Sequence, residues 1–150
     1  MSAKTQVLGL IDHAHASAPK LAENAVVRNG LSDHPGHEVA RRQMSGFGGM
    51  VSFELDGTFE EVVALVSSRR YFTLGESLGG VKALLCHPAS MTHASIPAEA
   101  RAELGLSDTL IRLSPGCENS EDLVHDLLEG LEQVEQARSA KSSLAASAAD

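Results

Sequence analysis

The residue best suited to bind an anionic ligand is Arg112, which lies in the apolar segment Leu110-Ile111-Arg112-Leu113-Ser114. Alternation along a strand would place Arg112 on one face with Leu110 and Ser114. A guanidinium in such a segment is costly unless it meets an anion, and its planar fork suits a carboxylate. The alternative is an arginine on a solvent-facing strand surface, and the segment by itself favours that alternative.

A second candidate is the segment Glu76-Ser77-Leu78-Gly79-Gly80. Its paired glycines predict a loop whose backbone can approach a ligand closely. Glu76 and Ser77 then either serve that ligand or lie in solvent as ordinary turn residues. The segment alone leaves both interpretations open.

Two other patterns do not predict a site. His34 and His37 have no nearby cysteine or third histidine to complete a metal site. The glycine-rich stretch at residues 46–49 is followed by a strand pattern and lacks the Gly-Lys-Ser/Thr of a phosphate loop. We expect a surface turn and a strand start instead.

Composition restricts the class of protein. The net charge is −8 and the four lysines are scattered, which argues against binding to nucleic acid or to an anionic membrane. Cys86 and Cys117 form no disulfide framework, so we expect a reducing, cytoplasmic environment. A secreted protein that has lost its signal is the disfavoured alternative. No apolar run reaches membrane-spanning length.

The hydrophobic pattern predicts elements that could position these candidates. Strands are expected at residues 25–27, 50–55, 71–74, 81–87 and 109–114, and helices at 4–18, 37–44, 58–68, 97–105 and from about 119. From residue 137 the pattern dissolves into serine and alanine, which indicates frayed helix or disorder. Alternating strands, short turns and helices on one side predict an α+β fold.

The helix at residues 58–68 carries the clearest local signal. Thr58 and Glu61 form a capping box, in which each side chain satisfies a free backbone donor of the other residue. Its predicted buried stripe consists of Phe59, Val62, Val63 and Val66.

Four phrases together resemble a known family. They are Ser45-Gly46-Phe47-Gly48-Gly49-Met50-Val51-Ser52-Phe53, Glu76-Ser77-Leu78-Gly79-Gly80, His87-Pro88-Ala89-Ser90-Met91-Thr92-His93 and Leu110-Ile111-Arg112-Leu113-Ser114. In order and spacing they are similar to the C-terminal domain of the pyridoxal-phosphate (PLP) enzymes of cysteine and methionine metabolism. That family includes cystathionine gamma-synthase, cystathionine gamma-lyase, methionine gamma-lyase and O-acyl-homoserine sulfhydrylases. The resemblance covers roughly residues 20–135.

The resemblance implies a mostly antiparallel sheet of about four to five strands covered by helices on one face. Together with the hydrophobic pattern, which supplies the leading helix at 4–18 and the flexible tail at 137–150, it predicts a domain that spans residues 1–136. Arg112 would bind the α-carboxylate of an amino-acid substrate, with Ser77 close by and Glu76 helping to select the substrate's distal end. Ser90, Thr92 and His93 are expected to be turn and strand-end hydrogen bonders.

The cofactor is implied for a complete enzyme and not for this chain. In the family the large domain supplies the Schiff-base lysine and the phosphate anchor, and no lysine here has a matching context. We therefore expect no cofactor-binding or catalytic residue in this chain, and no activity from it alone. The implied partners are a PLP-bearing large domain or subunit, within a homo- or hetero-oligomer.

The complete reaction would be γ-replacement or γ-elimination. Three explanations of the missing domain stay open: a fragment of a longer enzyme, a separate subunit, or a freed domain that serves in binding, assembly or regulation. Met1 and the tail slightly favour a self-contained chain.

Overall fold

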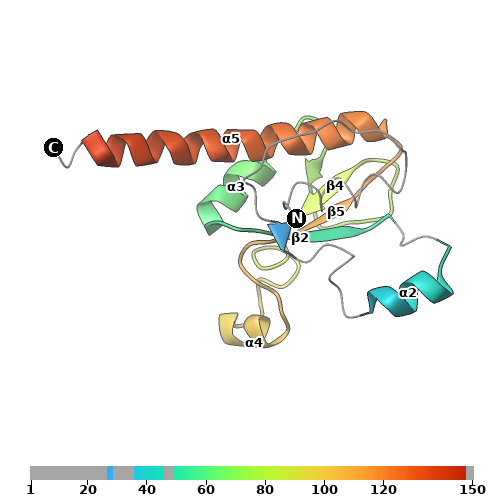
Figure 1. Ribbon diagram of the computed structural model, residues 1–150. Helices are drawn as coiled ribbons and strands as arrows, with labels where there is room; N and C mark the ends of the chain where they lie inside the picture. The colour runs from blue at the N-terminus through green and yellow to red at the C-terminus, as the bar shows by residue number, and fades with distance from the viewer. Residues whose placement is uncertain (1–26, 29–35, 46–48, 148–150) are drawn as a thin grey trace.

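A computed structural model describes residues 27–28, 36–45 and 49–147. Its elements follow the order β1 (Val27–Arg28), α2 (His37–Gln43), β2 (Val51–Leu55), α3 (Phe59–Ser67), β3 (Thr73–Leu74), β4 (Leu84–Cys86), α4 (Ala98–Glu103), β5 (Leu110–Ser114) and α5 (Ser120–Ser147). The α+β class is confirmed (Figure 1). The helix predicted at residues 4–18 lies outside the described residues.

The strands form one sheet in the order β1-β2-β5-β4-β3. The pairs β1–β2, β2–β5 and β4–β5 are antiparallel, whereas β3 runs parallel to β4. The prediction of a mostly antiparallel sheet is therefore corrected to a mixed sheet. The parallel pair arises because residues 75–83 carry the chain across without a hairpin, so that β4 continues in the direction of β3.

One face of the sheet is buried beneath two helices. Val51, Phe53 and Leu55 of β2 alternate with less buried residues, as period-2 alternation predicted. The register places Phe53 beside Ile111, so that neighbouring strands present apolar side chains to the same side. In Figure 1, α3 and α5 lie against each other over this face, and their apolar residues join the strands in one core.

The capping box of α3 is confirmed. Thr58 Oγ1 accepts from the Glu61 N–H, and the Glu61 carboxylate accepts from the Thr58 N–H. The predicted stripe is wrong at two positions, since Phe59 is 43% and Val63 is 42% exposed. The helix instead buries Val62, Leu65 and Val66, because its contact with α5 rotates Leu65 into the core.

A buried carboxylate fixes the turn between α3 and β3. Asp126 of α5 accepts hydrogen bonds from the backbone N–H groups of Arg70 at 2.8 Å, Tyr71 at 2.8 Å and Phe72 at 3.1 Å. Arg69 lies beside it, with Nη1 3.9 Å from Asp126 Oδ1 and donating to the Asp126 carbonyl. The two side chains are 1% and 2% exposed, so this network links the helix layer to the chain that enters β3.

The last helix includes most of the tail, in agreement with the helical alternative. Residues 137–147, predicted as frayed helix or disorder, continue α5 as far as Ser147. Arg138 stabilises this extension, because it donates to both carboxylate oxygens of Glu61 at 2.6 and 2.7 Å and to the Asp56 carbonyl. Through these hydrogen bonds Arg138 lowers the pKa of Glu61 to about 2.

None of the helices described here combines the length and apolarity needed to cross a membrane.

Candidate functional site

Arg112 lies on the face of the sheet opposite the helices. It alternates with the buried residues Ile111 and Leu113 of β5, so its side chain points away from the core. Its neighbours across the sheet are Ser52 of β2 and Cys86 of β4. Arg112 is half-buried. The structure thus places the arginine at the centre of the sheet on the side that neither α3 nor α5 covers.

The guanidinium of Arg112 is held by backbone carbonyls. Nη2 donates to the Glu76 carbonyl at 2.8 Å and to the Ser77 carbonyl at 3.4 Å. Nε is buried and has no hydrogen-bond partner in the described residues. None of the ion pairs found in the described part of the chain involves Arg112. A fixed cation without a carboxylate partner is suited to bind an anionic group.

The three candidate residues therefore meet at one place. The backbone of Glu76 and Ser77 contacts Arg112, while both side chains are exposed. No hydrogen bond or ion pair of these two side chains is found in the described part of the chain. The register of the sheet could not be deduced from spacing alone, so this meeting was predicted only through the family resemblance.

Two residues that hold the chain between β3 and β4 were not singled out by sequence reasoning. Ser114 Oγ accepts a hydrogen bond from the Gly79 N–H at 2.9 Å. Further along, the Glu118 carboxylate accepts from the Ala83 N–H at 2.7 Å. Ser114 belongs to the strand phrase, but its role depends on a contact across 35 residues that no local pattern reveals.

The third phrase supports the fold near the start of β5. His87 is 3% exposed, with Nδ1 2.7 Å from Ser90 Oγ and Nε2 3.0 Å from the Asp108 carbonyl. Because a carbonyl only accepts, Nε2 carries a proton. Thr92 Oγ1 lies 2.7 Å from His93 Nδ1. Ser90, Thr92 and His93 thus have hydrogen bonds of the expected kind, whereas the buried role of His87 was not predicted.

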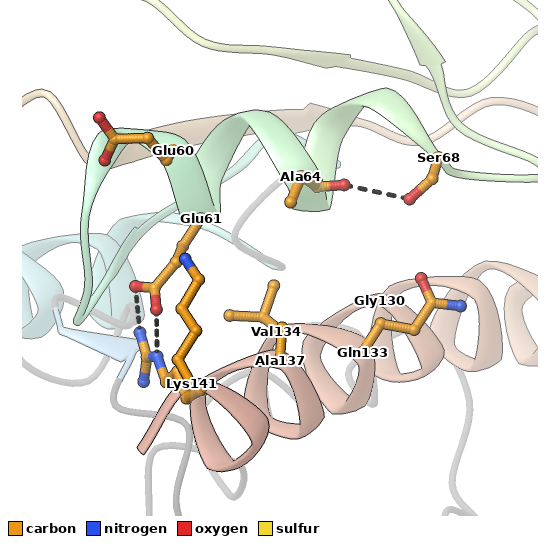
Figure 2. A pocket seen from close by; sticks show the side chains of 10 residues that line it. Glu60, Glu61, Ala64, Ser68, Gly130, Gln133, Val134, Ala137 and Lys141 are labelled. Carbon is orange, nitrogen blue, oxygen red and sulfur yellow. Dashed lines mark hydrogen bonds and ion pairs between the residues drawn. The ribbon is translucent and has the colours of Figure 1, made fainter. Parts of the chain in front are cut away.

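A shallow groove between α3 and α5 is the other candidate (Figure 2). Val134, Ala137 and Ala64 line its apolar part. Its strongest charges neutralise each other, since Glu61 is bound by Arg138, and Figure 2 shows Lys141 beside Glu61. Because Arg138 is already paired with Glu61, this groove is less suited to an anionic ligand than the surface around Arg112.

Comparison with known proteins agrees with the sequence resemblance. The family model described as Cys/Met metabolism PLP-dependent enzyme matches residues 13–132. A cystathionine beta-lyase of Lactococcus lactis is 52% identical over 139 residues, which cover 87% of this chain and 36% of the relative. A cystathionine gamma-lyase of Bacillus subtilis is 52% identical over 105 residues, covering 70% of this chain and 27% of the relative.

A solved structure is also similar. It is cystathionine gamma-synthase from Xanthomonas oryzae pv. oryzae in complex with aminoacrylate and cysteine, with a TM-score of 0.70 and 49% identity. The match covers 89% of this chain and 33% of that one. The chain therefore spans about a third of the length of the proteins it matches.

Proposed function

The chain belongs to the family of PLP-dependent enzymes of cysteine and methionine metabolism, and we propose that it supplies the part of such an active site that binds the substrate's α-carboxylate. The proposed reaction is γ-replacement or γ-elimination on a substrate of the cystathionine or homoserine-ester type. Relatives named cystathionine gamma-lyase and gamma-synthase support this class, and the beta-lyase relative adds β-elimination to it.

The observation that carries the proposal is the state of Arg112. Its guanidinium is fixed by the carbonyls of Glu76 and Ser77, yet no acidic side chain of the described residues pairs with it. Its Nε also lacks a partner. An arginine fork held in one orientation binds a carboxylate bidentately, which fixes both the position and the direction of an amino acid.

Ser77 and Glu76 complete the proposed role. Their carbonyls hold the arginine, so any substrate carboxylate on Arg112 lies beside this loop. The Ser77 hydroxyl is then placed to support the carboxylate, and the exposed Glu76 side chain to contact the distal end of the substrate.

The described residues do not fit the cofactor. PLP needs a lysine for its Schiff base together with anchors for its phosphate and its ring, and it serves as the electron sink for carbanions. Lys82 is exposed in the turn before β4, and Lys141 is exposed on α5 beside Glu61. We therefore infer that a PLP-bearing domain or subunit holds the cofactor, and that this chain is inactive without it.

A freed binding or regulatory module is the alternative. It would use the same arginine, but with part of the enclosing surface missing. If the chain is instead only a part of the enzyme, binding of an amino acid to the lone chain is expected at millimolar Kd at best, roughly −4 kcal/mol. Calorimetry that gave a micromolar Kd for one amino acid would favour the module over the enzyme part.

The proposal is tested by complementation. The part of the B. subtilis cystathionine gamma-lyase that lies outside the matched segment is co-expressed with this chain, and both are co-purified. We expect a complex that releases product from cystathionine, with neither part active alone. Co-purification without turnover, in a complex that has bound PLP, would overturn the proposed function.

A further inference from the structure

The 76–80 loop is attached to β5 at two points. Arg112 donates to the carbonyls of Glu76 and Ser77, and Ser114 Oγ accepts from the Gly79 N–H at 2.9 Å. Residues two apart on a strand point to the same side, so Arg112 and Ser114 face the loop together. One side chain therefore holds the first half of the loop and the other holds its second half.

Burial makes the Ser114 contact effective. Ser114 is 2% exposed, so water does not compete strongly for its hydroxyl. All five loop residues are exposed, and Leu78 is 53% exposed, so the loop has no apolar anchor of its own. Without hydrogen bonds to β5, such a loop would have little to restrain it.

The backbone at Gly79 is shaped for this contact. Its φ is +70°, a value that favours glycine. With this backbone conformation, the Gly79 N–H donates to Ser114 Oγ. A residue with a side chain at position 79 would have free space but a strained backbone. The hydrogen bond and the glycine thus support the same loop geometry.

We propose that Ser114 is a positioning residue for substrate binding. Resting on the proposed function, this role acts through the loop: by holding Gly79, Ser114 keeps Ser77 and Glu76 in place above Arg112. Ser114 itself need not touch the substrate. Its loss would loosen the support for the carboxylate while the cofactor chemistry, supplied by the partner, stays intact.

The first test uses the full chain by itself. Amide hydrogen exchange of Gly79 is measured by NMR in the wild type and in Ser114→Ala. We expect exchange at Gly79 to accelerate about fivefold, the typical effect of one lost hydrogen bond. Gly105, which has φ +73° in the turn after α4, is the control, and its amide exchange should be the same in both proteins. Unchanged exchange at Gly79 would overturn the proposal.

The second test uses the complemented enzyme. Ser114→Ala should raise KM for the amino-acid substrate about fivefold while kcat changes less than about twofold. Gly79→Ala should act similarly, whereas Gly105→Ala imposes the same backbone strain away from the site and should leave KM unchanged. A merely structural role would lower thermal stability without a selective rise in KM, and that result would contradict positioning.

The two proposals fail separately. A wild-type complex that binds PLP but has no turnover counts against the proposed function. The amide hydrogen exchange of Gly79 in the lone chain still decides whether Ser114 holds the loop. An active complex in which Ser114→Ala alters neither exchange nor KM removes the positioning role and leaves the carboxylate site of Arg112 standing.

Discussion

Substitution of Asp126 by asparagine should remove a large fraction of the protein's free energy of unfolding. Asp126 accepts hydrogen bonds from three backbone N–H groups, at residues 70, 71 and 72, which lead directly into β3. Asparagine has one acceptor oxygen in place of two, and its NH₂ group would face N–H donors. The substitution also removes the negative charge beside the buried Arg69.

The magnitude follows from these contacts. A buried donor left without an acceptor costs about 1–3 kcal/mol, and removal of one partner from a buried ion pair costs about 3–5 kcal/mol in all. The two effects overlap here, so we expect a loss of about 3–5 kcal/mol. A domain of this size typically has about 5–15 kcal/mol of stability in total. The variant should therefore be marginally folded.

Urea denaturation followed by circular dichroism measures this loss. Asp122→Asn is the matched control, because Asp122 lies one turn earlier on α5 and is exposed. Because Asp122 lies in the first turn of α5, we expect Asp122→Asn to lose at most the helix-dipole interaction, about 0.3–1 kcal/mol of the free energy of unfolding. A loss below about 1 kcal/mol for Asp126→Asn would refute the reasoning that this carboxylate fixes the turn.

Three further predictions concern α5 and the cofactor. Gly130→Ala should destabilise the chain by about 1–3 kcal/mol in urea despite the better helix propensity of alanine, because its Cβ would meet the fixed guanidinium of Arg69 and lie 2.6 Å from Leu65 Cδ1. Glu61→Gln keeps a capping-box residue but loses the pair with Arg138. The free energy of unfolding should fall by about 1 kcal/mol at neutral pH. This value allows for solvent screening, because the side chains of Glu61 and Arg138 are 18% and 34% exposed. The pKa of Glu61 is lowered from 4.5 to about 2, so the difference in stability between wild type and Glu61→Gln should shrink as the pH falls through this interval. Urea denaturation at several pH values measures this, and a difference that stays constant would contradict the stabilising ion pair with Arg138. The lone chain mixed with PLP should show no visible internal-aldimine absorption, and a mapped adduct at Lys82 would contradict the cofactor inference.

Local patterns were sufficient for most of the framework. The alternation at residues 51–55 predicted both the strand β2 and its buried face, and the capping box located the start of α3. These features were predictable because each depends on residues a few positions apart. The arginine in the apolar β5 segment could be named as a candidate, but the segment alone favoured a solvent-facing arginine, and only the family resemblance reversed that preference.

The remaining features depend on contacts between distant parts of the chain. The parallel pairing of β3 with β4 and the burial of Asp126 follow from how the helices pack on the sheet. The extension of α5 to Ser147 follows partly from Arg138, whose partner Glu61 is 77 residues away. The bond between Gly79 and Ser114 is of the same kind. The periodicity of the sequence does not predict contacts between residues so far apart.

The claim that Arg112 binds the substrate's carboxylate is tested most directly by Arg112→Lys in the complemented enzyme. A lysine keeps the charge but not the planar fork, so kcat/KM for the amino-acid substrate should fall about 30- to 1000-fold, or about 2–4 kcal/mol. Arg138→Lys makes the same exchange at a bidentate arginine on the helix side of the sheet, and it should lower stability without lowering kcat/KM. A complex that assembles normally and keeps its wild-type kcat/KM with Arg112→Lys would contradict the carboxylate site.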